Sequence, residues 1–135
     1  MVLAAAAVAN KGEIMRPYLV ETVNDSRGET LQQGSAHHWL TATTPEISGI
    51  IKQGMIDAVR IGTATAAAVP GYQVAGKTGS AQNPHGQTHA WFIGFVPADQ
   101  PSLAVAVIFE NAGAGGTEAA PVAARLLSAA LNRDY

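Results

Sequence analysis

A lysine, two hydroxyls and exposed backbone lie together at residues 76–80, Gly-Lys-Thr-Gly-Ser, here named the lysine strip. Lys77 is one of three lysines in the chain, and a glycine flanks the Lys77-Thr78 pair on each side. Because glycine has no side chain, the peptide groups of the strip are open to a ligand. A cation, a hydroxyl and accessible N–H groups together predict a binding site for an anion.

One interpretation of the strip is a nucleotide-phosphate loop. Residues 71–78 match the pattern G-x-x-x-x-G-K-[ST] in full. In such a loop a strand comes before the glycines, and a helix begins at the lysine and directs its N-terminus at phosphate. Here the preceding residues are rich in alanine, and Gly79 and Pro84 interrupt any helix after Lys77. A nucleotide hydrolase is therefore the lesser alternative, and it predicts a helix directly after Lys77.

A strand over residues 72–82 gives the strip a different chemistry. On a regular strand Lys77 and Thr78 point to opposite faces, and a twist or bulge near Gly76 or Gly79 would turn both towards one ligand. An extended substrate can then lie along the strand, and the backbone N–H of Ser80 can face a developing oxyanion. This arrangement predicts acyl transfer on a peptide-like substrate.

Lys77-Thr78-Gly79 resembles the third motif of penicillin-binding proteins and serine β-lactamases. The wider sequence resembles the end of a class B penicillin-binding transpeptidase domain. The segments that carry the resemblance are residues 7–12, 15–20, 62–64, 75–82, 89–95, 105–111 and 119–121. They cover nearly the whole chain, so residues 1–135 are expected to be the C-terminal portion of such a domain.

The resemblance implies a role for each residue of the motif. Lys77 would keep the site electropositive and assist proton transfer at the nucleophile. Thr78 would bind the carboxylate of a D-Ala-D-Ala stem peptide or of a β-lactam, and Gly79 would let the substrate lie against the strand. The backbone N–H of Ser80 would form half of the oxyanion hole. His89 begins the next strand and is a further candidate for contact with the substrate.

The same family also needs an S-x-x-K motif, which carries the nucleophilic serine, and an S-x-N motif. No serine of the chain has lysine three residues later or asparagine two residues later: Ser26, Ser35, Ser48, Ser80, Ser102 and Ser128. In the family both motifs lie upstream, together with two further strands of the sheet. We therefore expect the parent to be a serine-type D,D-transpeptidase of bacterial peptidoglycan synthesis, and this chain alone to be inactive. The resemblance also implies a membrane anchor upstream and a site on the extracytoplasmic face.

Composition limits the partners and cofactors that the chain can have. Charged residues make up 13% of the chain and the net charge is −2, which argues against nucleic acid as a partner. The chain has no cysteine, which excludes disulfides and thiolate ligands. Pro84 and Gly86 prevent the helix that would bring His85 and His89 to one face, so we predict no metal and no other cofactor. A non-catalytic binding module of the cell envelope stays as the second alternative.

Hydrophobic periodicity and turn residues predict an α+β fold, with an antiparallel sheet of at least three strands packed on a C-terminal helix. Helices are expected over residues 2–10, 45–60, 63–68 (short) and 121–132. Strands are expected over residues 72–82, 89–97 and 103–110, with an edge hairpin over 15–23 and 29–33 and a loop over 34–42. Short connections between the three main strands favour an antiparallel meander.

Two helical stripes are predicted to be buried. In the helix over residues 45–60 the stripe is Ile47, Ile50, Ile51, Met55, Ala58 and Val59. In the last helix it is Val122, Leu126, Leu127, Ala130 and Leu131. The strand over 103–110 is apolar on both faces, which predicts cover on two sides. Since the chain itself cannot cover all of this surface and strand edge, we expect it to self-associate.

Overall fold

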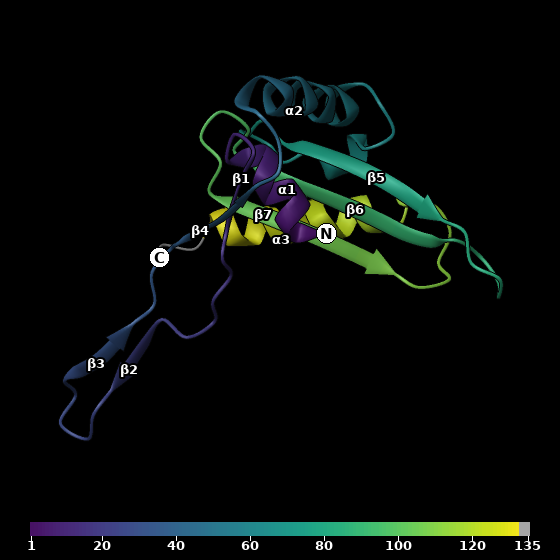
Figure 1. Cartoon of the computed structure of the whole chain (residues 1–135). Helices are drawn as coiled ribbons and strands as arrows, with labels where there is room; N and C mark the ends of the chain where they lie inside the picture. Colours follow the sequence, from purple (N-terminus) through teal and green to yellow (C-terminus); the bar gives the residue numbers. More distant parts are fainter. Residues whose placement is uncertain (133–135) are drawn as a thin grey trace.

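The computed structural model describes residues 1–132 as an α/β body from which a β arm projects (Figure 1). Its elements are α1 (Val2–Ala9), β1 (Glu13–Met15), β2 (Thr22–Asn24), β3 (Thr30–Gln33), β4 (His38–Thr41), α2 (Pro45–Arg60), the 3-10 helix η1 (Thr65–Ala67), β5 (Ala75–Ala81), β6 (His89–Val96), β7 (Leu103–Phe109) and α3 (Ala119–Leu131). The predicted α+β class, with an antiparallel sheet and a C-terminal helix, is confirmed. Within residues 1–132, no helix is both long and apolar enough to cross a membrane.

The central sheet has the order β5-β6-β7, and each neighbouring pair is antiparallel. Phe92 and Val107 lie opposite each other in the register and face α3. Phe92 is fully buried, and Ala120, Ala123 and Leu127 of α3 belong to the same core cluster. The small alanines let α3 lie close to the sheet, so this cluster joins the last helix to the strands.

The opposite side of the sheet is covered by α1 and α2 (Figure 1). Phe95 is fully buried there against Ala5 of α1 and Met55 and Ile56 of α2. α2 begins at Pro45, where the Thr44 hydroxyl accepts the Ile47 N–H at 3.3 Å, as its hydroxyl-proline start predicts. The capping residues therefore set the beginning of α2, and its packing against Phe95 sets its orientation.

The predicted buried stripe of α2 is only partly correct. Ile47, Ile50 and Ile51 are 49%, 74% and 41% exposed, while Met55 and Val59 are buried as predicted. A buried serine explains the rotation of the helix: Ser48 is 1% exposed, and its hydroxyl donates to the Val8 carbonyl of α1 at 2.8 Å. The Ser48 hydroxyl can be buried because it is hydrogen-bonded. It therefore occupies the buried face of α2 that the hydrophobic pattern assigns to the isoleucines beside it.

The last helix also turns differently from the prediction. Leu127 is buried, but Leu126 is 51% exposed. Alanines occupy the buried positions instead, at Ala119, Ala120 and Ala123. α3 therefore begins two residues before Pro121 and buries its smallest residues, because a close approach to the sheet leaves no room for a larger side chain there.

Two strand predictions in the N-terminal half are wrong. Residues 15–23 do not form one edge strand: β1 ends at Met15 and β2 begins at Thr22. Residues 34–42 are not all loop, because β4 (His38–Thr41) pairs with β1. The Arg16 N–H still donates to the His37 carbonyl at 2.8 Å, but Pro17 has no N–H with which to continue the ladder.

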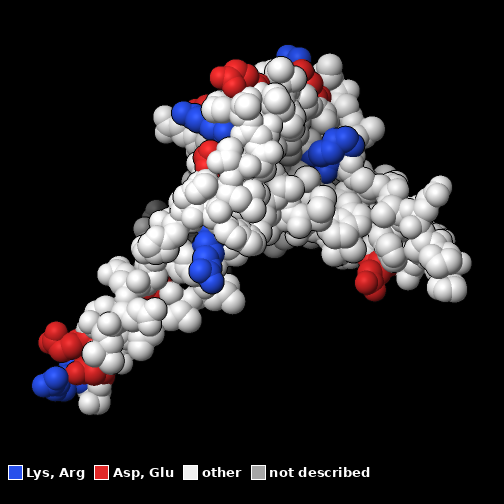
Figure 2. Space-filling model, in the orientation of Figure 1, with Lys and Arg blue, Asp and Glu red and all other residues white. Residues whose placement is uncertain are grey.

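The predicted hairpin exists and forms the projecting arm (Figure 1). Every residue of β2 and β3 is exposed. Asp25 closes the turn by accepting the Arg27 and Glu29 N–H groups at 2.8 and 3.0 Å. These hydrogen bonds lower the pKa of Asp25. Charged side chains gather at the tip of the arm, whereas most of the body is uncharged on the face that Figure 2 shows.

Candidate functional site

The lysine strip lies on β5, which is an edge strand of the central sheet. The register with β6 runs without interruption from Ala75 opposite Phe95 to Ala81 opposite His89. No bulge interrupts β5, and Lys77 and Thr78 stay on opposite faces of the strand. Gly76 serves close packing instead, since a Cβ there would lie 2.3 Å from the ring of Phe92.

The side chain of Lys77 is exposed and folds along the strand edge. Its Nζ donates to the carbonyl oxygen of Thr78 at 2.6 Å. This bond shows that the Thr78 carbonyl points to the free edge of β5 and away from β6. Because alternate residues of an antiparallel strand direct their peptide groups to the same side, the Ser80 N–H also points to the free edge.

Thr78 is 8% exposed and lies on the other face from Lys77. Its hydroxyl oxygen is 2.8 Å from the hydroxyl oxygen of Thr63, which lies in the loop after α2. Thr63 belongs to residues 62–64, one of the segments that resemble the family, but no sequence motif assigns it a role. A spacing of fifteen residues across an irregular loop carries no periodic signal that could have connected the two hydroxyls.

The hydroxyl of Ser80 accepts the Gly115 N–H at 3.3 Å. Gly115 belongs to the loop between β7 and α3, and it sits directly on the strip. A Cβ at Gly115 would lie 2.2 Å from the Trp91 carbonyl oxygen and 2.4 Å from the Gly79 carbonyl oxygen. This loop therefore supports the strip from the α3 side. The contact also gives the Ser80 hydroxyl a structural partner.

His89 lies at the end of the β5-β6 ladder, opposite Ala81. Its Nδ1 accepts the Asn111 N–H at 3.0 Å, which turns the ring towards the loop after β7. Lys77 lies opposite Ile93, four residues further along β6, which is about 13 Å at the usual rise of a strand. The structure thus joins Thr63 to the strip and leaves His89 apart from Lys77.

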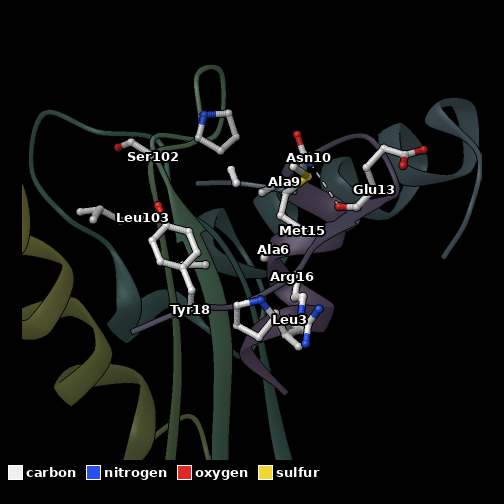
Figure 3. A pocket seen from close by; sticks show the side chains of 14 residues that line it. Leu3, Ala6, Ala9, Asn10, Glu13, Met15, Arg16, Tyr18, Ser102 and Leu103 are labelled. Atoms are coloured by element: carbon white, nitrogen blue, oxygen red, sulfur yellow. Dashed lines mark hydrogen bonds between the residues drawn. The ribbon is translucent and has the colours of Figure 1, made fainter. Parts of the chain in front are cut away.

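A cavity of about 450 Å³ lies elsewhere, between α1, the start of the arm and the β6-β7 turn (Figure 3). Leu3, Tyr18 and Leu103 line it, and no residue of the strip does. This cavity and the lysine strip are therefore separate features of the described chain. Among residues 1–132 no three His, Cys, Asp or Glu side chains gather in a way that could hold a metal ion.

The nucleotide hydrolase alternative fails on its own prediction. Lys77 is the third residue of a seven-residue strand, and no helix begins at it. The backbone before Gly71 is also not a strand of the sheet, since η1 and an isolated bridge between Val69 and Tyr72 precede β5. An edge strand with a lysine and a buried threonine fits a peptide-like ligand better than a phosphate.

The model of the penicillin-binding protein transpeptidase domain matches residues 1–128. The chain belongs to the penicillin-binding protein transpeptidase family. Peptidoglycan D,D-transpeptidase PbpA of Mycolicibacterium smegmatis is 36% identical over 138 residues, which cover 94% of this chain and 28% of PbpA. MrdA of Acinetobacter baumannii, also a peptidoglycan D,D-transpeptidase, is 31% identical over 134 residues, which cover 88% of this chain and 20% of MrdA.

Solved structures of the family have the same fold. The ceftriaxone acyl-enzyme complex of penicillin-binding protein A from Mycobacterium tuberculosis has a TM-score of 0.91 at 34% identity, over 97% of this chain and 31% of that one. The D,D-transpeptidase domain from Eggerthella lenta has a TM-score of 0.87 at 37% identity, over 95% of this chain and 30% of that one. This chain therefore spans less than a third of each of these four proteins.

Proposed function

We propose that this chain forms the lysine-strip wall of a peptidoglycan D,D-transpeptidase site, as the C-terminal part of the transpeptidase domain. The observation that carries the proposal is the edge geometry of β5. Lys77, the Thr78 hydroxyl and the outward N–H of Ser80 lie within a stretch of four residues on β5. The outer edge of this strand is free in the described chain. A cation, a hydroxyl and an N–H so placed suit a substrate that has a carboxylate and a reacting carbonyl.

The substrate is a D,D-terminated stem peptide or a β-lactam that lies along this edge. Thr78 binds its carboxylate, and Gly79 leaves room for the peptide backbone. The Ser80 N–H donates to the oxyanion as the carbonyl is attacked. Lys77 supplies positive charge near the nucleophile and assists its deprotonation. His89 is an outer substrate contact, beyond the end of the strip.

The nucleophilic serine and the opposite wall come from upstream residues of the same domain. The exposed apolar side chains of this chain support such a neighbour. Ile50 on α2 is 74% exposed and Ile108 on β7 is 42% exposed, and β7 has no strand on its outer edge among residues 1–132. The parent works in the cell envelope, with its anchor upstream and its site on the extracytoplasmic face of the membrane.

The test compares the chain alone with the full-length protein that contains it. Each is incubated with penicillin G and analysed by intact-protein mass spectrometry. We expect a penicilloyl adduct on the full-length protein and none on residues 1–135. An adduct on the chain alone would show that it carries its own nucleophile, and its absence from the folded full-length protein would reject the proposal.

The same experiment distinguishes the transpeptidase from the remaining alternative, a non-catalytic binding module. A non-catalytic binding module predicts no adduct and no β-lactam effect on the melting temperature of the full-length protein. The acyl-enzyme complex of the similar penicillin-binding protein A favours the transpeptidase.

A further inference from the structure

Thr63 contacts the lysine strip through its hydroxyl, and no pattern in the sequence predicts this contact. Its hydroxyl oxygen lies 2.8 Å from that of Thr78, the residue to which the proposed function gives the substrate carboxylate. Thr78 is almost fully buried, whereas Thr63 is exposed. The two hydroxyls therefore form a pair that reaches from the buried face of β5 to the surface.

The backbone around Thr63 is fixed on two sides. On one side, the N–H groups of Gly62 and Ala64 both donate to the Ala58 carbonyl, at 3.2 and 3.0 Å, and tie the loop to the end of α2. On the other side, a Cβ at Gly116 would lie 2.6 Å from the Thr63 carbonyl oxygen. Because both neighbours hold this backbone, the position of the Thr63 hydroxyl is set by the fold.

The chemistry of the pair follows from a count of protons. Each hydroxyl has one proton to donate and two lone pairs that accept. The pair uses one of its two protons internally, so one proton is left for a third group. When Thr63 donates to Thr78, the free proton is that of Thr78, and hydrogen bonds in a chain polarise one another. Thr78 is then a directed donor to an anion.

We propose that Thr63 is a positioning residue that aims the hydroxyl proton of Thr78 at the substrate carboxylate. The inference rests on the proposed function. Without Thr63, the Thr78 hydroxyl can turn its proton to the backbone instead, as threonine hydroxyls readily do. Thr63 then contributes to recognition of the carboxylate without touching the reacting carbonyl.

The test measures second-order acylation rate constants of the full-length protein with penicillin G and with its methyl ester, which lacks the carboxylate charge. For Thr63→Val we expect a loss of about tenfold with penicillin G and less than about twofold with the ester, since a hydrogen bond to a charged group is at stake. Thr63→Ser keeps the hydroxyl and should restore most of the rate. Thr65→Val, at an exposed position of η1, is the matched control and should react like the wild type.

The two substrates separate a positioning role from a structural one within a single protein preparation. Equal losses with penicillin G and its ester would show that Thr63 only supports the fold, and no loss with either would show that it is irrelevant. Both results overturn the inference. Should Thr63→Val fail to fold, Thr63→Ala gives the same ratio. Absence of acylation in the wild-type protein would instead reject the proposed function, and this inference with it.

Discussion

Lys77 and Thr78 are adjacent, yet their side chains leave β5 on opposite faces, and the Nζ of Lys77 donates to the Thr78 carbonyl at 2.6 Å. The lysine is therefore held at the strand edge by the residue that follows it. The threonine hydroxyl is held from the other face by Thr63. One edge strand thus carries a cation on one face and a hydrogen-bonded hydroxyl on the other, without any bulge.

Replacing Lys77 should separate charge from packing. In the full-length protein, Lys77→Met keeps much of the length of the side chain but removes the ammonium group. We expect the rate of acylation by penicillin G to fall by about 100-fold or more, the usual range for a group that moves a proton in the transition state. Because Lys77 is exposed, thermal unfolding should change little. A variant that acylates at the wild-type rate would contradict the role of Lys77.

Ser80 tests whether the backbone or the hydroxyl matters. Ser80→Ala removes the acceptor of the Gly115 N–H and should cost about 0.5–1.5 kcal/mol of unfolding free energy. The Ser80 N–H remains, so the acylation rate should stay within about threefold of the wild type. Chemical denaturation and stopped-flow acylation give the two quantities. A fall of about 100-fold in rate would instead point to chemistry at the hydroxyl.

We expect that Gly115, in the loop between β7 and α3, cannot be replaced by a residue with a side chain without loss of stability. Gly115→Ala places a Cβ against the carbonyl oxygens of Trp91 and Gly79, so we expect a loss of about 1–3 kcal/mol in the free energy of unfolding. Gly54→Ala is the matched control, since nothing lies within 4 Å of its Cβ in α2. It should stabilise by about 0.5–1 kcal/mol, because alanine is the better helix former. Urea denaturation of both variants measures the contrast.

The uncovered isoleucines of α2 predict that the chain alone self-associates. Ile50 and Ile51 are 74% and 41% exposed. We expect sedimentation velocity to show species larger than the monomer that grow with concentration, and Ile50→Glu with Ile51→Glu to reduce them. Gln53→Lys adds a charge to the same helix without removing apolar surface and should leave them unchanged. A monomer at all concentrations would refute the prediction.

The turn of the arm should loosen in acid. Hydrogen bonds from the Arg27 and Glu29 N–H groups lower the pKa of Asp25 below its ordinary 3.8. Since the folded pKa is the lower one, the stabilisation is complete above the ordinary pKa and is lost as the pH falls through the folded value. Amide exchange and chemical shifts of Arg27 and Glu29 between about pH 6 and pH 2 should report this loss.

The variant Asp25→Asn provides the control for this titration. Asp25→Asn keeps an acceptor oxygen but cannot ionise, so the pH dependence of both amides should disappear. If the wild-type amides show no change over the same range, the charge of Asp25 does not hold the turn.

The local pattern of the sequence determined much of this protein. Thr44 and Pro45 set the start of α2, and the apolar runs set β6 and β7. Breakers after Lys77 excluded a helix there, and residues 75–82 carried the resemblance to the family that the comparisons confirm. These features depend on neighbours along the chain, such as caps, turns and periodicity, so the sequence alone displays them.

Only the tertiary structure decided which faces are buried and which distant groups meet. Ser48 turns α2 by its bond to Val8, against the hydrophobic pattern. Thr63 reaches Thr78, and Gly115 reaches Gly79, across separations that no periodicity encodes. The register of β5 likewise shows that no bulge lies at Gly76 or Gly79. Such contacts arise from packing between whole elements, and a sequence contains that information only through the fold.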